Sequence, residues 1–299
     1  MQLRKQLLFW GILGLFIQGC STSQQPSPAY EKEINEWHKQ RVENLKTPDG
    51  WLSLAGLFFL EEGENTFGSR AEQHLVFPKQ APQQMGTIQL QEGQLELKVA
   101  EGVTIEVNGK TVQQVQVIAH SSDTPFLMTW GSLTWFVMQR GERFMVRLRD
   151  AENKAIESLA KIDRYDIDHN WNINARLVQY ESPQKVVMKN VLGMDIGLDS
   201  EGYLEFEIGK ETFQLITLDG GPEEYFIIFA DDTTGGETYG GGRYLYVPRA
   251  NSDGVTQIDF NKAHNPPCVF TDYATCLLPL AENQLKVAVL AGEKNYGDH

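Results

Sequence analysis

Short apolar alternations broken by turns run from Trp51 to about Asp150, and they constrain the fold more than any other feature of the chain. Segments such as GTIQLQEGQLELKV, GVTIEVNGKTV and LTWFVMQRGERFMVRLRD alternate apolar and polar residues, which is the pattern of half-buried strands. Asn108 and Gly109 lie between strand-like flanks and favour a tight hairpin. Six or more strands at this spacing predict a β-sandwich-like domain within residues 30–150.

Strand-like segments resume beyond residue 170, in ARLVQYE, QKVVMKNVLGMDIGLD, GYLEFEIGKETFQLITLD and EEYFIIFADD. Residues 181–184, with the sequence ESPQ, are expected to form a turn between two of these strands. The segments do not alternate with helices, so a dinucleotide-binding fold is not expected. We predict a mainly β protein in which residues 151–299 form a second antiparallel β domain.

The segment YEKEINEWHKQRVENLK, residues 30–46, predicts an N-terminal amphipathic helix that ends at the turn residues TPDG. Its apolar residues fall near one stripe: Tyr30, Ile34, Trp37, Val42 and Leu45. We expect this helix to pack on the sheet that follows it. His38 is interpreted as a surface or cap residue because no partner is implied nearby.

The N-terminus predicts export and lipid attachment. Residues 1–19 have the features of a lipoprotein signal peptide, with two basic residues before an apolar run too short to span a bilayer comfortably. The tetrapeptide IQGC, residues 17–20, resembles a bacterial lipobox, in which the cysteine, here Cys20, is lipidated on sulfur. Residues 20–29 are polar and proline-containing, as a flexible tether is. We expect a chain anchored to the bacterial cell envelope, in the inner or outer membrane; the alternative is an uncleaved anchor.

The charge balance excludes several partners. Removal of residues 1–19 leaves 24 Lys+Arg against 40 Asp+Glu, a net charge of −16. Nucleic acid selects for clustered basic residues, so no nucleic-acid partner is expected. The same balance disfavours electrostatic adhesion to anionic lipid, which leaves an acyl chain on Cys20 as the membrane attachment. Nothing in the sequence indicates the oligomeric state.

A glycine-rich segment, FADDTTGGETYGGGRYLY at residues 229–246, is the first candidate for function. It lacks the Gly-Lys-Ser/Thr of a phosphate loop, and its acidic residues would repel an anion. It is either a mobile hairpin tip or a ligand-contacting loop, and Arg243 is either in a structural ion pair or an anchor for a carboxylate ligand. The proposed ligand-binding residues are Asp231, Tyr239, Arg243, Asp259, Asn261, Asn283 and Glu293.

Two cysteines remain once Cys20 is assigned to the lipid. Cys268 and Cys276 lie close together in a chain expected to be exported, so a disulfide is the simplest interpretation. Two unpaired buried thiols are one alternative. A zinc site that also uses Asp259 and His264 is another, but the spacing matches no zinc knuckle, and we expect neither a metal nor a cofactor.

No catalytic motif is recognisable, so whether the chain is an enzyme stays open. There is neither a G-x-S-x-G elbow in an α/β pattern nor an H-E-x-x-H motif. The leading hypothesis is a binding or accessory protein for a small molecule or envelope component. One alternative is a hydrolase that uses Asp231, Asp259 or Glu293 as acid or base. A purely structural envelope component, which predicts a shallow surface, is the other.

Four segments resemble the bacterial and archaeal family called domain of unknown function 1684. They are GWLSLAGLFFLEEGENTFGS, FADDTTGGETYGGGRYL, DFNKAHNPPCVFTDYATCLLPLAENQL and AGEK, and the resemblance runs from about Trp37 to Lys294. The family implies no established activity and no catalytic residues. His264 stands where the family typically has tyrosine, which counts against a required ligand or base there, and Leu277 stands where proline is usual.

Overall fold

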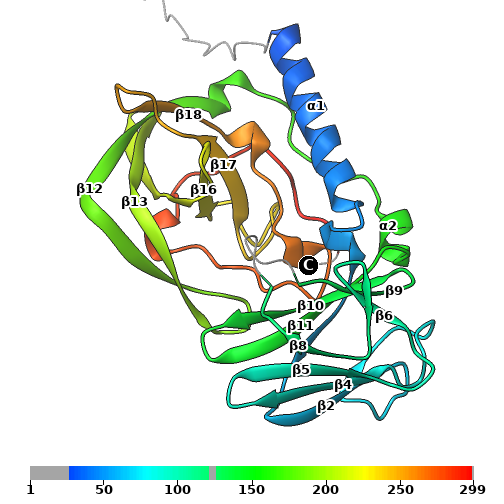
Figure 1. The fold of residues 1–299 in the computed structure, drawn as a ribbon. Coiled ribbons are helices and arrows are strands. Elements are labelled where there is room, and N and C mark those ends of the chain that lie inside the picture. The colour runs from blue at the N-terminus through cyan, green and yellow to red at the C-terminus, as the bar shows by residue number, and fades with distance from the viewer. Residues whose placement is uncertain (1–26, 121–125, 298–299) are drawn as a thin grey trace, which may run out of the picture.

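The structure, a computed structural model, describes residues 27–120 and 126–297 (Figure 1). Four sheets and one long N-terminal helix make up most of the described chain, which confirms the predicted mainly β fold. The expected signal segment and Cys20 lie outside the described residues. None of the described helices is long and apolar enough to cross a membrane.

Two sheets build the first half of the chain. One has the order β1-β11-β10-β9-β6-β7, with β1 (Leu54–Phe59), β11 (Arg143–Asp150), β10 (Leu133–Arg140), β9 (Met128–Trp130), β6 (Ile105–Val107) and β7 (Lys110–Val112). The other has the order β3-β2-β4-β5-β8, with β3 (Leu75–Val76), β2 (Gly63–Gly68), β4 (Gly86–Gln91), β5 (Gln94–Val99) and β8 (Gln114–Val117).

The two sheets share one core, as the predicted sandwich requires. Phe67 of β2 and Trp135 of β10 are fully buried, with ring centroids 5.8 Å apart. The predicted hairpin joins β6 and β7, where Asn108 and Gly109 both have positive φ angles, 47° and 78°. Two consecutive positive φ angles are what a tight hairpin turn of this kind needs, and Asn-Gly adopts them at low cost.

Two further sheets build the second half. The first has the order β14-β13-β12-β18, with β14 (Glu211–Ile216), β13 (Asp195–Ile208), β12 (Asn172–Lys189) and β18 (Val255–Asp259). The second has the order β15-β16-β17, with β15 (Leu218–Asp219), β16 (Glu224–Phe229) and β17 (Arg243–Pro248). Figure 1 shows β12 and β13 curving around β16 and β17. A core that includes Phe206, Phe229 and Phe260 fills the space between the sheets.

The expected turn at residues 181–184 is wrong. Strand β12 runs through this segment, and its pairing with β13 shifts register between Gln179 and Gln184. Such an irregularity accommodates Pro183, which cannot donate a hydrogen bond to a regular ladder.

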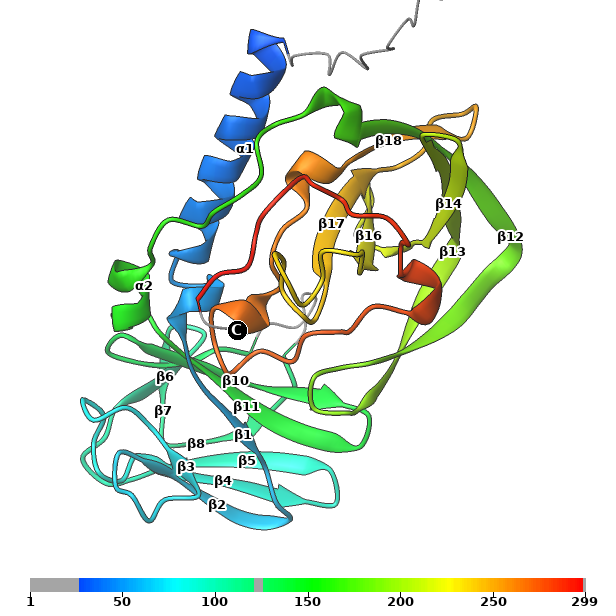
Figure 2. The same cartoon turned by 180° about the vertical axis from the view of Figure 1, so that it is seen from behind.

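Helix α1 (Pro28–Leu45) begins close to the predicted position, because Ser27 caps its N-terminus and Pro28 occupies the first turn. It does not pack on the sheet that follows it. Figures 1 and 2 show it lying along the second half of the chain. The Tyr30 hydroxyl donates to Asp259 Oδ1 over 2.8 Å, and Lys262 Nζ lies 2.7 Å from Glu33 Oε1.

Short helices complete the described chain: α2 (Lys154–Ser158) and the 3-10 turns η1 (Trp51–Ser53), η2 (His169–Trp171), η3 (Phe260–Lys262), η4 (Pro267–Val269) and η5 (Ala281–Asn283). Strand β11 ends at Asp150, where the sequence places the end of the first domain. Helix α1, which was assigned to the first domain, packs against the second half. The division into domains at residues 30–150 and 151–299 therefore stays a prediction.

Candidate functional site

Arg243 and Asp231, the two residues at the centre of the predicted ligand site, bond to each other inside the second half. Arg243 Nη2 lies 2.7 Å from Asp231 Oδ2, and both side chains are fully buried. The guanidinium also donates to the carbonyls of Val289 and Ala291. The geometry is therefore that of a structural ion pair, one of the two alternatives left open by the sequence.

The second oxygen of Asp231 organises the glycine-rich loop. It accepts hydrogen bonds from the backbone nitrogen and the hydroxyl of Thr233, over 2.7 and 2.6 Å. Tyr239 is half-buried in the same loop. Gly242 has a φ of 81°, and a β-carbon there would lie 2.5 Å from the Phe229 carbonyl oxygen, so only glycine fits without rearrangement.

Asp259 and Asn261 also bond within the protein. Asp259 Oδ1 accepts hydrogen bonds from the Tyr30 hydroxyl and from the backbone nitrogen of Asn261. Asn261 in turn exchanges hydrogen bonds with both backbone groups of Asp168. These two side chains tie helix α1 and the segment before β12 to η3.

Asn283 lies between β14 and β16, away from Asp259 and Asn261. Its side chain exchanges hydrogen bonds with both backbone groups of Ile216 and donates to the carbonyl of Ile228. It is almost completely buried, and it joins β14 to β16. Of the seven predicted site residues, five are buried in the second half, and Tyr239 and Asp259 are half-buried.

Glu293 has one carboxylate oxygen with a hydrogen-bond partner and one without. Its Oε2 accepts a hydrogen bond from the Asn265 backbone nitrogen over 2.8 Å. Its Oε1 is buried without a hydrogen-bond partner, 3.7 Å from both Arg41 Nε and His38 Nε2. Burial raises the pKa of the Glu293 carboxyl above its ordinary value, while the Arg41 guanidinium opposes that shift.

His38 is not the surface residue that the sequence suggested. Its side chain is 15% exposed and lies beside the Glu293 carboxylate. Burial, with the positive charges of Arg164 and Arg41, lowers the His38 pKa to about 4. The imidazole is consequently neutral at neutral pH, and its contact with Glu293 is not an ion pair there.

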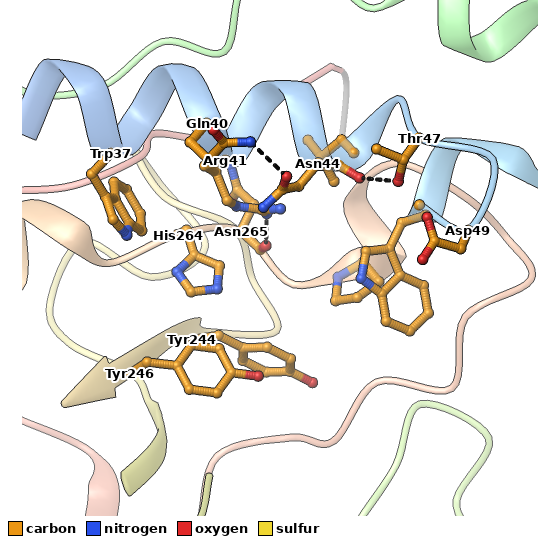
Figure 3. Close-up of a pocket in the computed structure, with 14 residues that line it drawn as sticks. Trp37, Gln40, Arg41, Asn44, Thr47, Asp49, Tyr244, Tyr246, His264 and Asn265 are labelled. Atoms are coloured by element: carbon orange, nitrogen blue, oxygen red, sulfur yellow. Dashed lines mark hydrogen bonds between the residues drawn. The ribbon is translucent and has the colours of Figure 1, made fainter. Parts of the chain in front are cut away.

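A cavity of about 690 Å³ lies between α1 and the second half, and Arg41 is among the residues that line it (Figure 3). The lining residues are Trp37, Gln40, Arg41, Asn44, Leu45, Thr47, Asp49, Gly50, Trp51, Tyr244, Tyr246, His264, Asn265 and Pro267. None of the seven predicted ligand-binding residues is among them. The cavity is the candidate functional site.

Local geometry explains why these residues converge. Trp37, Gln40, Arg41 and Asn44 are spaced i, i+3, i+4 and i+7, which puts them on one face of α1. Tyr244 and Tyr246 alternate along β17 and so project from the same face of that strand. His264 is paired with Tyr244 through two backbone hydrogen bonds of 2.9 Å, which brings its ring alongside both tyrosines.

Aromatic faces form one wall of the cavity. The rings of Tyr246 and His264 are stacked, with centroids 6.0 Å apart and an interplanar angle of 9°. Trp37 approaches His264 from the helix, with centroids 5.9 Å apart (Figure 3). Tyr246 remains 45% exposed, so its ring is accessible. The hydroxyl of Tyr244 is used within the protein, where it donates to the Leu277 carbonyl and accepts from the Leu277 nitrogen.

Amides and one cation also line the cavity, and those on α1 share the helix face of Trp37. Gln40 donates to Asn44 Oδ1 over 2.9 Å, and Arg41 Nη2 donates to the Asn265 carbonyl over 2.9 Å. The Oδ1 atom of Asn265 is buried without a hydrogen-bond partner. Burial lowers the Arg41 pKa, and Glu293 opposes that shift. The cavity thus offers hydrogen-bond donors and acceptors beside aromatic surface.

His264, in the aromatic wall, is neutral. Burial lowers its pKa to about 3, and Arg41 contributes to the same shift. Its Nδ1 lies 3.1 Å from the Lys262 carbonyl, which indicates that this nitrogen carries the proton. A neutral imidazole is well suited to stacking and hydrogen bonding.

The predicted disulfide is present beside the cavity. Cys268 and Cys276 are bonded, with Cα atoms 6.0 Å apart, and they hold the loop that follows the cavity residue Pro267. No group of three or more metal-ligating side chains occurs among the described residues.

Comparison with known proteins finds a family model that matches most of the second half. Residues 157–294 match the family model DUF1684, described as a protein of unknown function. The match supports this domain family. It includes Tyr244, Tyr246, His264 and Asn265, whereas α1 and Trp51 lie before it, so it is shorter than the resemblance expected from Trp37 to Lys294.

Other comparisons add no functional information. Comparison with curated proteins found no match. A solution NMR structure of an uncharacterized protein from Haloarcula marismortui is similar at 29% sequence identity and a TM-score of 0.40. That similarity covers 50% of this chain and 82% of the archaeal one.

Proposed function

We propose that the chain is an exported, lipid-anchored binding protein of the cell envelope, whose cavity takes a carbohydrate unit. The observation that carries the proposal is the convergence of aromatic rings and amide side chains on one cavity of about 690 Å³. Cavities of about 300–1,000 Å³ are typical of small-molecule sites.

Carbohydrate chemistry fits this combination of aromatic and amide side chains. A sugar ring presents C–H groups on its faces, which pack against the electron-rich faces of aromatic rings such as Tyr246 and Trp37. Its hydroxyl groups both donate and accept, as the side chains of Gln40, Asn44 and Asn265 do. A purely apolar ligand would leave the buried Asn265 Oδ1 without a hydrogen-bond partner, which is costly.

The cellular setting rests on the N-terminal sequence and on the disulfide. The lipobox-like IQGC and the preceding apolar run are features of lipoprotein export. A disulfide between Cys268 and Cys276 is stable in an oxidising compartment, which supports export as well.

The geometry favours neither alternative function. Asp231 is bonded to Arg243, and Asp259 to Tyr30, so neither carboxylate is available as an acid or base. Glu293 does not line the cavity. A purely structural component is expected to have a shallow surface, which a cavity of this volume does not match.

Intrinsic tryptophan fluorescence tests the proposal, because Trp37 and Trp51 both line the cavity. We expect at least one of a panel of neutral and N-acetylated mono- to tetrasaccharides to change the fluorescence of the full chain in detergent. Trp37→Ala and Tyr246→Ala should each weaken that binding about tenfold, a loss of about 1.4 kcal/mol.

Tyr273→Ala is the matched control, since Tyr273 is 39% exposed but lies outside the cavity. Its saccharide affinity should equal that of the unsubstituted chain. If no saccharide changes the fluorescence at concentrations on the order of 10 mM, or if the control weakens binding as much as Tyr246→Ala, the proposal is wrong.

A further inference from the structure

Strand β11 carries positive charge on the face of its sheet that is opposite the sandwich core. Val146 and Leu148 point into that core, whereas Met145 packs with Phe136 on the other face. Because side chains alternate along a strand, Arg147 and Arg149 share the face of Met145. Figures 1 and 2 show β10 and β11 on the side of the first half that adjoins the second half.

Arg147 is buried on this face, and no described residue supplies a counter-charge in contact with it. It is only 8% exposed, and its Nε has no hydrogen-bond partner. No ion pair of Arg147 occurs among the described residues. Its guanidinium carbon lies 5.7 Å from the centroid of the Trp51 ring. Trp51 is also one of the residues that line the carbohydrate cavity.

Neighbouring charges make the environment of Arg147 more positive. Arg149 is half-buried, its Nε also lacks a hydrogen-bond partner, and its guanidinium lies over Phe136. Burial, and then the charges of Arg149 and Arg140, lower the Arg147 pKa to about 10. The acidic group that acts on Arg149 is the exposed Asp49, which forms no ion pair with it in the described chain.

A buried guanidinium without an anion is unfavourable, because it loses hydration and gains no counter-charge. Such a group is unexpected in a chain with a formal net charge of −14, where acidic residues are plentiful. An anion from solution would supply the missing partner. Cα atoms two residues apart on a strand are about 6.6 Å apart, so two long side chains can bracket one oxyanion.

We propose that Arg147 and Arg149, with the exposed Arg140 nearby, form a binding site for a phosphate group at the junction of the two halves. Phosphate fits better than a carboxylate, because it carries about −1.5 to −2 charge at pH 7 and offers more acceptor oxygens to several guanidinium groups. This site is separate from the carbohydrate cavity and does not depend on it.

Inorganic phosphate is the probe for the first experiment. Thermal unfolding and tryptophan fluorescence of the full chain in detergent are measured with phosphate and with chloride at equal ionic strength. We expect phosphate to raise the unfolding temperature and, because Arg147 lies over Trp51, to change the fluorescence. Arg147→Met should raise the Kd for phosphate at least tenfold.

Arg147→Met has a second expected result. Without phosphate, this variant should unfold at the same temperature as the unsubstituted chain or higher, since an unpaired buried charge has been replaced by an apolar side chain. The matched control is Arg176→Met, an exposed arginine on β12, whose Kd for phosphate should stay within about twofold of the original. If Arg147→Met does not fold, Arg149→Gln provides the same test and should weaken phosphate binding at least fivefold.

The phosphate group can belong to a free solute or to a lipid headgroup. Protein anchored in phosphatidylcholine vesicles, with and without phosphatidylglycerol, distinguishes them. Competition from phosphatidylglycerol, seen as a higher Kd for added phosphate, identifies a headgroup; an unchanged Kd identifies a soluble phosphate. The proposal is overturned if phosphate acts no differently from chloride, or if Arg147→Met and Arg149→Gln bind phosphate as tightly as the original chain.

Discussion

Arg243 and Arg147 are both buried guanidinium groups, and within the described chain only Arg243 has a carboxylate beside it. Sequence alone does not show which buried arginine has a carboxylate partner. The glycine-rich loop drew attention to Arg243, whereas Arg147 sits in an ordinary alternating strand and gave no signal. Pairing depends on which side chain lies opposite across the fold, and a single sequence does not contain that information.

Replacing Arg243 by methionine should destabilise the protein by about 3–5 kcal/mol, because Asp231 would remain buried without its partner. The double variant Asp231→Asn/Arg243→Met should recover much of that loss, since asparagine keeps an acceptor for Thr233 without the charge. Urea unfolding measures both.

An exposed ion pair gives the comparison for this prediction. Lys189 lies 2.7 Å from Asp195 at the surface, and Lys189→Met should cost less than about 1 kcal/mol. If Arg243→Met costs no more than Lys189→Met, the buried pair does not have the structural role assigned to it.

Among the elements, α1 shows what pattern reasoning reaches and where it stops. The helix was predicted at residues 30–46 and is found at Pro28–Leu45, because periodicity and capping are local signals. The partner of its apolar face was predicted incorrectly. Leu45 packs in a small cluster with Leu52 and Ile162, and polar contacts of the helix reach Asp259 and Asn265, more than 200 residues further along the chain. The spacing of Trp37, Gln40, Arg41 and Asn44 was a readable signal for the cavity, but it was overlooked.

The loop closed by Cys268 and Cys276 is the element whose stabilisation can be tested most simply. The two residues are 8 apart in sequence, and closing a loop of this length restricts the unfolded chain by about 2–3 kcal/mol. The double variant Cys268→Ser/Cys276→Ser should lose about this much in urea unfolding. Cys20→Ser, which removes a cysteine without opening the loop, should lose nothing measurable; an equal loss in both variants would contradict the prediction.

For the whole molecule, the cavity is the feature that the sequence did not reveal. Its walls come from residues 37–51 and 244–267, and only the folded chain brings them together. The mainly β class, the hairpin at Asn108 and the disulfide were predictable, because each depends on local composition or on a few residues close in sequence. The seven expected site residues were chosen because they are polar and lie near glycine or proline. In the structure, most of them form hydrogen bonds or ion pairs to other residues of the chain and so stabilise the fold.

Two neutral histidines between α1 and the second half should make the whole molecule sensitive to acid. The His264 pKa is about 3 in the folded protein against an ordinary 6.5, so this stability is complete above pH 6.5 and is lost as the pH falls toward 3. At pH 5 the loss from His264 is on the order of 2 kcal/mol. His38, with a pKa of about 4, acts in the same direction.

The substitution His264→Tyr isolates this contribution, since tyrosine does not titrate in this range. The free energy of unfolding is measured at pH 7 and at pH 5. Its fall between these two pH values should be about 2 kcal/mol smaller in the variant than in the original chain. Glu293, whose pKa is raised, acts in the opposite direction but in both proteins, so it cancels in the comparison. Parallel pH profiles for the two proteins would contradict the conclusion that the buried, neutral His264 makes the protein sensitive to acid.

The docking of α1 on residues 259–265 also limits when this part of the protein can fold during its synthesis. A ribosome releases α1 more than 200 residues before it releases the docking surface of the helix. Contacts this distant in sequence form late, because most of the chain must be present before they close. The cavity, which needs both partners, therefore exists only once the chain has been synthesised as far as its last lining residue, Pro267, and a chain truncated before residue 259 has no such cavity.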